Sequence, residues 1–473
     1  MEKSLNSLFS SLRQHKLFVL SLFILWILLF LGHSWEEGLK MDAMIESAIA
    51  KKLLSQSDWT ILRFAPSSYP QGFYDHPPFL AWVEAVFFKV FGVSDSVARI
   101  PPALFALGTT LGVVFWGSLS GGLAQGLLSA FILLTSNRFI KFASDVLLEG
   151  PLSCFFVWGS VCVLWGEKKE GRASALLSFM FGIFLGLAFL TKSVFALFLI
   201  GSVVFSCFFA RIKPKYAIQI LLMGICGFSL IIGWWILNAG GWNFIRNHFS
   251  TLSGRAQHRE WRNVFIPINN LLSTYWPWCP FFIMGCFSLL RNSKRACFSQ
   301  ILAASQFFVI VLCLSTGNQI WEHYLILCLP PAAVVSAKVF QDFLGHRFEM
   351  FEKNVFLIAI LLAVFLACYP LRIRRERMEP LGTTLKEMEA VCRGQKEILV
   401  TREAMSEWMA IAIISWKSSY EGKSVTSLDS VPEEGQLLIT NRNQKPNSSL
   451  WVKVPLTLST LELYQSKQYP YCR

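Results

Sequence analysis

The sequence has few charged residues for its length. Only 15% of its 473 residues are Asp, Glu, Lys or Arg, whereas 54% are hydrophobic. A soluble globular domain carries about 25% charged residues, so this composition excludes an ordinary soluble protein. Long apolar runs take the place of the missing charge, and the fold is therefore predicted to be that of an all-α polytopic membrane protein with many transmembrane helices.

Features that define other classes of protein are missing as well. The C-terminal region contains no glycine-rich phosphate loop, no metal-binding cluster and no recognisable nucleophile motif. The net charge of +13 is spread over loops instead of gathering on one soluble face, so no nucleic-acid partner is expected. A secondary transporter usually has repeated halves and ionisable residues inside its spans. Neither feature is evident here, and transport and a non-catalytic scaffold are kept only as alternatives.

Apolar runs long enough to cross about 30 Å of hydrocarbon occur about eleven times. They lie near residues 17–33, 98–118, 121–137, 148–166, 173–190, 193–210, 216–238, 268–290, 298–315, 323–343 and 354–371. The first run follows basic residues, as a secretory signal does. It is longer than the apolar core of a signal and lacks a small-x-small cleavage site, so a retained anchor is expected.

The short loops between the runs predict the orientation of the chain. Lys and Arg are retained on the cytoplasmic side of a membrane, and every second loop is basic, with Lys168, Lys169 and Arg172, then Arg211, Lys213 and Lys215, then Arg291, Lys294 and Arg295, then Arg347 and Lys353. The N-terminus is therefore expected in the cytoplasm. The regions expected outside are 34–97, 138–147, the junction at Thr191-Lys192, 239–267, 316–322 and everything after Tyr369.

A change of composition after Pro370 predicts a domain boundary. Residues 1–371 are expected to form the transmembrane domain, including the outer loop 34–97, and residues 372–473 a small α/β domain. The predicted elements of this second domain are helices at 384–393 and 403–416 and strands at 397–401, 435–440 and 450–454. Its cysteines, Cys392 and Cys472, either form a disulfide on the oxidising side or stay apart, because their spacing says nothing about geometry.

Acids on the expected outer side are candidate catalytic residues. Asp42 opens an amphipathic helical pattern, Asp75 stands in the sequence Asp75-His76-Pro77-Pro78, and Asp145 and Glu149 precede an apolar run. Each also has a structural explanation, with Asp42 as a helix N-cap and an acid near Gly150-Pro151 facing the positive end of a helix. Two acids at one helix start leave a catalytic role open.

Positive charge is unusually dense in the outer loop 239–267, which carries Arg246, His248, Arg255, His258, Arg259 and Arg262. Phosphate is a natural partner, because guanidinium groups hold its oxygens in bidentate geometry. The alternative is a loop that pairs with lipid headgroups. Lys192 lies between two apolar runs, where it either faces a lipid-borne phosphate or snorkels to the membrane surface.

Motifs between Asp42 and Pro331 together resemble the integral-membrane glycosyltransferases of the GT-C fold that use polyprenyl-phosphate sugars. The resemblance is to the aminoarabinose lipid A transferases and the related protein mannosyltransferase-like family. The matching segments are, in order, DAMIESAIAKKLLSQSDW, YDHPPFLAWVEAVFFKVFG, LLEGPLSCFF, GLAFLTKSVFAL, STYWPWCPFF and EHYLILCLPPAAV. The chain departs from the family at four positions. Ala43 stands where an acid is usual and His76 where the aminoarabinose enzymes have Lys. Ser193 stands where Gly is usual, and Ile320 where a basic residue is often found. The resemblance therefore identifies the family and leaves the sugar open.

The resemblance implies an inverting transfer from a polyprenyl-phosphate sugar to a hydroxyl or phosphate of lipid A or another envelope glycan. The reaction would take place on the periplasmic side of a bacterial inner membrane, where the C-terminus would also lie. Asp42 would be the base or the acceptor-orienting carboxylate, with Asp75, Asp145 and Glu149 lining the same cavity. The expected phosphate-binding residues are His76, Lys192, Arg246, Arg255, Arg259, Arg262, His323 and Tyr324. No cofactor is required for a monophosphate leaving group, although a divalent metal is left open. A protein Ser or Thr is the alternative acceptor.

Overall fold

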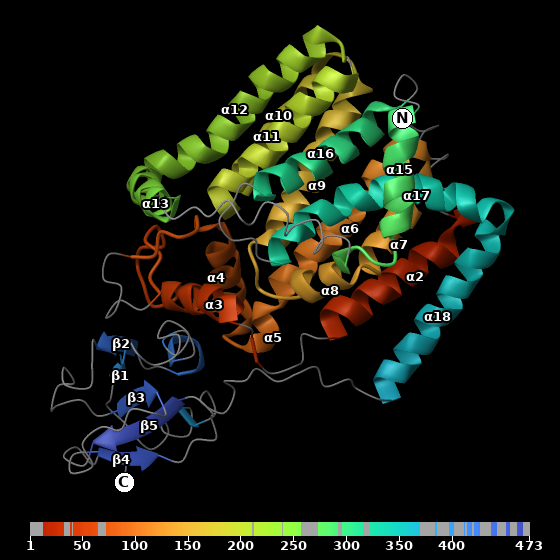
Figure 1. Ribbon diagram of the computed structural model, residues 1–473. Helices are drawn as coiled ribbons and strands as arrows, with labels where there is room; N and C mark the ends of the chain where they lie inside the picture. The colour runs from red at the N-terminus through yellow and green to blue at the C-terminus, as the bar shows by residue number, and fades with distance from the viewer. Residues whose placement is uncertain are drawn as a thin grey trace. The chain divides into compact units, whose positions relative to one another are not determined.

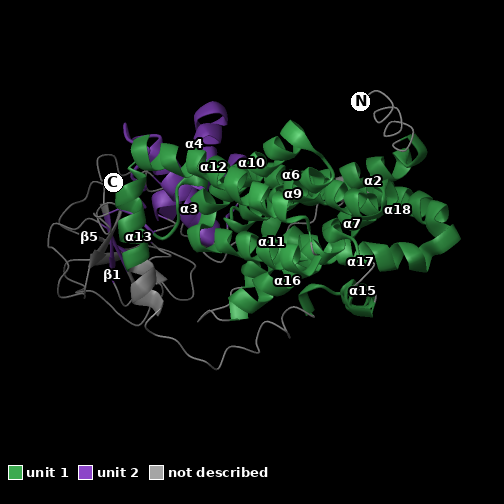
Figure 2. Cartoon of the chain, turned by 90° about the horizontal axis from the view of Figure 1, so that it is seen from above, with its two compact units in different colours: residues 1–35, 75–79, 99–371 green, residues 36–74, 80–98, 372–473 purple. Residues whose placement is uncertain are grey.

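The computed structural model describes residues 13–32, 38–39, 41–64, 72–210, 212–238, 240–256, 273–291, 296–315, 322–368, 384–385, 397–401, 411, 414–418, 421–425, 437–441, 451–454 and 461–466. The chain divides into two compact units, which Figure 2 shows in different colours. Unit 1 comprises residues 1–35, 75–79 and 99–371, and unit 2 comprises residues 36–74, 80–98 and 372–473. Segments of the outer loop thus share a compact unit with the C-terminal region.

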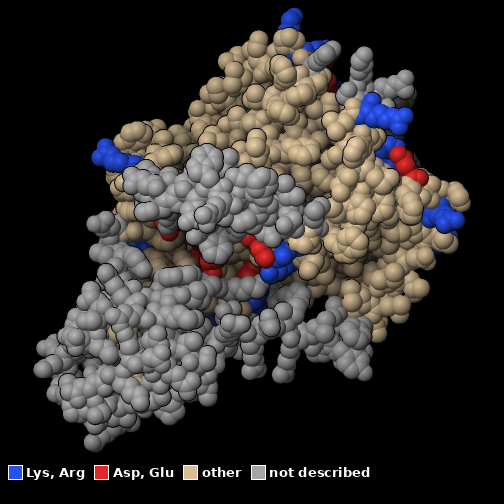
Figure 3. Space-filling model, in the orientation of Figure 1, with Lys and Arg blue, Asp and Glu red and all other residues tan. Residues whose placement is uncertain are grey.

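Unit 1 is built from helices (Figure 1). They are α2 (Lys16–Trp26), η1 (Ile27–Leu31), α6 (Ile100–Gly121), α7 (Leu123–Leu134), α8 (Asn137–Ala143), α9 (Glu149–Glu167), α10 (Gly171–Lys192), η3 (Ser193–Phe195), α11 (Ala196–Ala210), α12 (Pro214–Asn238), α13 (Gly241–Ala256), α15 (Cys279–Arg291), α16 (Phe298–Ser315), η5 (Glu322–Cys328), α17 (Leu329–Leu344), η6 (Gly345–Arg347) and α18 (Phe348–Cys368). Large apolar side chains such as Phe208 and Leu237 point outward, with 79% and 83% exposure. On the face drawn in Figure 3 the described surface of these helices carries few charges. Such an outer surface fits contact with lipid.

Every predicted apolar run overlaps a helix of this unit. By length and hydropathy, the described part of the chain contains five helical stretches able to cross a membrane, or six if the bent pair α7 and α8 is one span. The stretches are Asp95–Gly121, Gly171–Ala210, Pro214–Asn238, Phe298–Ser315 and Glu322–Val364. The mostly helical, multi-pass architecture is confirmed, and the count of about eleven spans stays a prediction.

The run predicted at 121–137 is broken in the structure. Helix α7 ends at Leu134, and α8 continues at an angle of 70°. The hydroxyls of Thr135 and Ser136 donate to the carbonyls of Phe131 and Ile132, both at 2.7 Å. Such side-chain bonds compete with the helical backbone pattern, and they take up carbonyls at the end of α7.

Helices α10 and α12 approach each other at glycines. A Cβ atom added to Gly182 would lie 2.0 Å from the carbonyl oxygen of Gly224, and one added to Gly227 would lie 2.1 Å from that of Phe179. Only residues without a side chain allow this approach, as in many membrane helix pairs. The position of α10, and hence of Lys192 at its end, is therefore fixed by backbone contact.

Unit 2 contains α3 (Met41–Leu53), most of α4 (Phe79–Phe91), α5 (Asp95–Ala98) and a five-stranded sheet. The hydroxyl of Ser47 on α3 donates to Glu84 Oε1 on α4 at 2.8 Å. The indole of Trp82 donates to the carbonyl of Trp59 at 2.8 Å. These bonds join chain segments that precede and follow Asp75-His76-Pro77-Pro78 in the sequence.

The sheet has the strand order β2-β1-β3-β5-β4. Its strands are β1 (Glu397–Thr401), β2 (Glu421–Val425), β3 (Leu437–Asn441), β4 (Trp451–Val454) and β5 (Leu461–Ser466). The β1 strand runs parallel to β2 and β3, and β5 runs antiparallel to β3 and β4. Strands predicted at 397–401, 435–440 and 450–454 correspond to β1, β3 and β4, whereas β2 and β5 were not predicted.

The predicted helices of the C-terminal region are described only in part, with residues 384–385, 411 and 414–417 helical. Cys392 and Cys472 lie outside the described residues, so their disulfide stays a prediction. The division of the chain into domains at residue 371 also stays a prediction.

Candidate functional site

Polar side chains gather where α9 begins and α10 ends. Glu149 is the first residue of α9, and Lys192 is the last residue of α10. Pro151 lies in the first turn of α9, where proline fits a helix and where an acid meets the positive end of the helix dipole. Helix α9 packs against both α10 and η5, and η5 carries His323 and Tyr324. The packing therefore brings together residues that are far apart in the sequence.

Lys192 and Glu149 form a buried ion pair. Lys192 Nζ donates to Glu149 Oε1 at 2.5 Å, and His323 Nε2 lies 3.9 Å from the same oxygen. The side chains of Lys192, Glu149 and His323 are only 10%, 2% and 16% exposed. The pair is neutral as a whole, and a protonated His323 would make the cluster positive.

Aromatic rings hold the ammonium of Lys192. Its Nζ atom lies 3.9 Å from the ring centre of Tyr324 and 4.5 Å from that of Phe195, in cation–π geometry. The two rings contact each other with centroids 5.1 Å apart. An ammonium group has three N–H donors, of which Glu149 takes one. The cation is thus fixed in position by a carboxylate and two rings.

A second charged group adjoins this cluster. On α8, Arg138 donates to Glu322 Oε2, and Lys141 lies 3.4 Å from the same oxygen. The ring of Phe142 lies between, 4.7 Å from Lys141 Nζ and 6.0 Å from the ring of His323. Sequence reasoning missed Arg138 and Lys141. The signal was available, because both are basic residues in a loop expected outside.

His248, one of the outer-loop basic residues for which phosphate is the predicted partner, is bonded to the turn after Lys192. His248 Nε2 lies 2.6 Å from the hydroxyl oxygen of Ser193, and its ring stacks on Phe244 with centroids 5.4 Å apart. His248 is only 4% exposed. Because Ser193 begins η3, this contact fastens α13 next to Lys192.

The described residues do not show the arginines of α13 and the following loop forming the predicted phosphate-binding group. Arg246 lies exposed on α13. Arg255 belongs to the same helix, and its side chain lies outside the description, as do Arg259 and Arg262 entirely. Phosphate binding by these residues stays a prediction.

The Asp75–Phe79 segment belongs to unit 1. Asp75 and His76 are half-buried, and the prolines after them are buried. The ring of Phe79 lies 5.1 Å from that of Phe155 on α9, so the motif is anchored on the helix that begins with Glu149.

Asp145 and Asp42 have different surroundings. Asp145 is buried between α8 and α9, where its carboxylate accepts the N–H of Val146 at 3.1 Å. Asp42 belongs to unit 2, where it is exposed in the first turn of α3. It therefore lies inside the helix instead of preceding it as an N-cap. The catalytic roles of both acids stay predictions.

The described residues contain no group of three or more His, Cys, Asp and Glu side chains placed to hold a metal ion. The expectation that the reaction needs no metal stays a prediction.

An apolar groove runs between α10, α11 and α12, with a volume of about 360 Å³. Phe181 and Leu185 of α10, Val203 of α11 and Phe228 of α12 are among the side chains that line it. Leu185 precedes Lys192 by seven residues, about 10 Å along a helix. The groove therefore lies on the same helix as the cation, a short distance before it.

The comparisons with known proteins agree with this architecture. The family model described as dolichyl-phosphate-mannose-protein mannosyltransferase matches residues 75–236, which include Asp75, Glu149 and Lys192. No curated protein sequence matches the chain.

Solved structures of membrane glycosyltransferases resemble the whole chain. ArnT from Cupriavidus metallidurans in the apo state is 14% identical with a TM-score of 0.74, and the match covers 96% of this chain and 98% of that one. The same protein bound to undecaprenyl phosphate is 13% identical with a TM-score of 0.70 over the same shares. The oligosaccharyltransferase AglB from Archaeoglobus fulgidus, in complex with an inhibitory peptide and a dolichol-phosphate, is 13% identical with a TM-score of 0.56, covering 92% and 70%.

These family and structural neighbours are glycosyltransferases. Residues 75–236 thus match the dolichyl-phosphate-mannose-protein mannosyltransferase family, and the chain has the fold of the GT-C glycosyltransferases.

Proposed function

We propose that this chain is an inverting glycosyltransferase that moves a sugar from a polyprenyl-phosphate donor to an acceptor hydroxyl or phosphate. The acceptor belongs to lipid A or to another glycan of a bacterial envelope, and the reaction takes place on the outer face of the inner membrane. The observation that carries the proposal is the buried Lys192–Glu149–His323 cluster at the end of α10. Similarity to a transferase bound to undecaprenyl phosphate supports the same class of donor.

The reaction makes two demands on the site. The acceptor oxygen forms a bond to the anomeric carbon while the bond from that carbon to the phosphate oxygen breaks, and the electron pair stays on the phosphate. The leaving phosphate gains one negative charge, which Lys192 and a protonated His323 stabilise. The acceptor proton passes to a carboxylate, for which we propose Asp42, with Asp75 as a second acid of the reaction.

The ion pair changes the role that we propose for Glu149. A carboxylate 2.5 Å from an ammonium is stabilised in its charged form and is a weak base. We therefore propose that Glu149 holds Lys192 in place toward the donor phosphate. This leaves Asp42 and Asp75 as the carboxylates for proton transfer and acceptor orientation.

The apolar groove between α10, α11 and α12 is proposed to take the first part of the polyprenyl tail. Its lining is almost entirely apolar, and on α10 it ends about two turns before Lys192. A tail in the groove would thus bring its phosphate to the Lys192 cluster.

Binding of undecaprenyl phosphate to the purified chain in vesicles tests the donor class. Lys192→Gln should weaken binding at least about tenfold, because a charge-assisted contact to phosphate is lost. Lys338→Gln is the matched control, since Lys338 lies on α17, is 48% exposed and pairs with Asp342. Equal binding by the Lys192 variant and the native chain would overturn the assignment.

Transfer from an undecaprenyl-phosphate sugar in vesicles tests the proposed base. Asp42→Asn should abolish transfer while undecaprenyl phosphate binding is kept. Near-normal transfer at normal expression would remove Asp42 from the mechanism. Mass analysis of lipid A and envelope glycans after deletion of the gene would then identify the sugar and the acceptor.

The family match favours a second candidate acceptor, a Ser or Thr hydroxyl of a protein. The chemistry at the donor is the same, so the two candidates differ only in the product. Intact-mass analysis of envelope proteins with and without the gene separates the two candidates. The mass of an envelope protein increases by that of a sugar only if a protein is the acceptor. A reporter fused after Arg473 tests the proposed periplasmic location of the C-terminus.

A further inference from the structure

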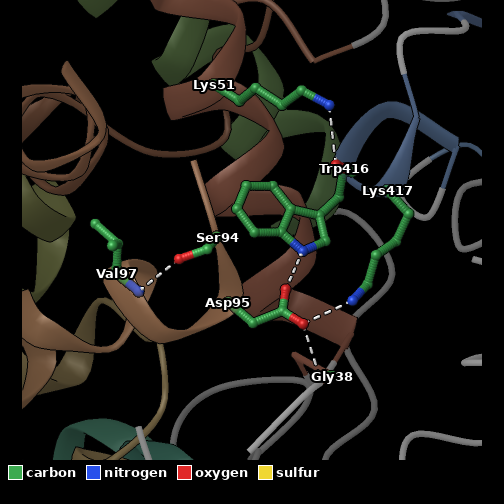
Figure 4. A network of polar contacts seen from close by, with 7 residues as sticks. All are labelled: Gly38, Lys51, Ser94, Asp95, Val97, Trp416 and Lys417. Atoms are coloured by element: carbon green, nitrogen blue, oxygen red, sulfur yellow. Dashed lines mark hydrogen bonds and ion pairs between the residues drawn. The ribbon is translucent and has the colours of Figure 1, made fainter. Parts of the chain in front are cut away.

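Residues 414–418 of the C-terminal region contact separate parts of the outer loop within unit 2 (Figure 4). The first contact is with α3. Lys51 Nζ donates to the carbonyls of Ser415, Trp416 and Ser418 at 3.1, 2.9 and 2.7 Å. An ammonium has three donors, so these carbonyls satisfy all of them. They lie at the C-terminal end of the helical residues 414–417, where a cation also meets the negative end of the helix dipole.

The second contact is with α5. The carboxylate of Asp95 accepts the indole N–H of Trp416 at 2.7 Å and the ammonium of Lys417 at 2.6 Å. It also accepts the backbone N–H of Gly38 at 2.7 Å. Ser94 accepts the N–H of Val97 at 3.2 Å, which caps the turn that carries Asp95. One carboxylate thus joins the start of the outer loop, its end and the C-terminal region.

The third contact is with α4, where the ring of Phe88 lies 5.6 Å from that of Trp416. The contact region is closed to solvent, because Trp416 is 4% exposed and the charged side chains of Lys417 and Asp95 are 7% and 11% exposed. Buried charges and donors of this kind need their partners. The geometry is therefore that of a specific fastening and not of a loose contact between two surfaces.

The fastening acts on the helix that carries Asp42. Lys51 follows Asp42 by nine residues, or about two and a half turns of α3. The two residues therefore lie on opposite faces of the helix, and Asp42 is exposed. Contact at Lys51 restrains the rotation and tilt of α3 from the face opposite Asp42, and it does not involve the Asp42 carboxylate.

We propose that residues 414–418 form a clamp that positions α3, and with it the carboxylate of Asp42, for the transfer reaction. Lys51, Asp95 and Trp416 are positioning residues that touch no substrate. The C-terminal region is then part of the catalytic apparatus. The last step of the inference rests on the proposed role of Asp42, whereas the clamp itself does not.

The test compares Lys51→Met with Lys89→Met in the full chain. Both changes remove an ammonium from a helix of unit 2, and Lys89 is exposed on α4. Lys51→Met should lower kcat by about tenfold to 100-fold, because small displacements of a reacting group have effects of this size. KM for the lipid donor should stay within about twofold, because the donor site is untouched. Lys51→Arg should restore part of the rate, and Lys89→Met should change neither constant.

Hydrogen exchange of α3 gives a second readout that needs no activity. Amides of residues 43–53 should exchange faster in Lys51→Met and should keep their native rates in Lys89→Met. Unchanged exchange in Lys51→Met would overturn the clamp, whatever the activity shows. Faster exchange with an unchanged kcat would instead overturn the positioning of Asp42. Near-normal transfer by Asp42→Asn would place the failure in the proposed function.

Trp416→Phe covers the case in which Lys51→Met does not fold. This change removes the indole donor to Asp95 and keeps a ring against Phe88. The same pattern of faster exchange in α3 and lower kcat is expected. Native behaviour in both measurements would overturn the proposal.

Discussion

Replacing Glu149 with Gln leaves Lys192 as a buried cation without its counterion. At an effective dielectric constant of about 20, unit charges 2.5 Å apart attract by about 7 kcal/mol. Desolvation of both groups offsets much of this attraction. Loss of one partner of a buried pair costs about 3 to 5 kcal/mol, because the remaining charge stays buried.

A second ion pair of nearly the same length, but exposed to solvent, separates the effect of burial on stability from the effect of distance. Lys338 and Asp342 lie 2.6 Å apart on α17, but their side chains are 48% and 61% exposed. Exposed pairs at this helical spacing contribute about 0.3 to 0.5 kcal/mol. Asp342→Asn should therefore have about a tenth of the effect of Glu149→Gln.

Thermal unfolding in detergent measures the difference. At roughly 2 °C per kcal/mol for a long chain, Glu149→Gln should lower Tm by about 6 to 10 °C and Asp342→Asn by about 1 °C. The double variant Glu149→Gln/Lys192→Met should recover much of the lost Tm, because no unpaired charge remains. Equal Tm values for the two single variants would refute the reasoning.

Further predictions concern a buried acid and a helix contact. Burial raises the pKa of Glu84 well above that of an exposed glutamate, so the folded protein keeps a proton that the unfolded chain loses above about pH 4.3. The contribution of Glu84 to stability is then greatest below that pH and falls as the pH rises toward the folded pKa. In a pH series of unfolding curves, Glu84→Gln should therefore flatten this slope and raise stability at neutral pH. Gly182→Ala puts a methyl group against the backbone of α12 and should cost about 1 to 3 kcal/mol. Gly233→Ala on α12, where a Cβ meets nothing within 4 Å, should be neutral in the same thermal assay.

Helices were predictable where hydropathy alone decides the structure. The apolar runs are longer than any soluble helix needs, and each overlaps a helix. The bend after Leu134 was not predicted, because the run stays apolar on average through Thr135 and Ser136, whose hydroxyls bond to carbonyls at the end of α7. The strand at 397–401 was predicted from its consecutive Ile, Leu and Val. Strand β2 was not, because EGKSV has low strand propensity and is a strand through its pairing with β1.

The candidate site was predictable as a set of residue types and not as an arrangement. Lys192 and Glu149 stood out because charged residues at the edge of apolar runs are rare. Their pairing joins residues 43 positions apart, and no spacing rule links them to His323. The sequence therefore suggested a catalytic role for Glu149 and a separate phosphate-binding role for Lys192, whereas the structure bonds the two side chains to each other.

The size of the groove on α10 sets how much of a polyprenyl tail it can hold in its proposed role. When each carbon group takes about the 30 Å³ that one water molecule occupies in the liquid, a volume of about 360 Å³ holds roughly a dozen carbon atoms, or two to three isoprene units. The remaining units of a long polyprenol would extend among the surrounding acyl chains, where they contribute little to selectivity. Synthetic carriers truncated beyond the third unit should then serve as well as natural ones.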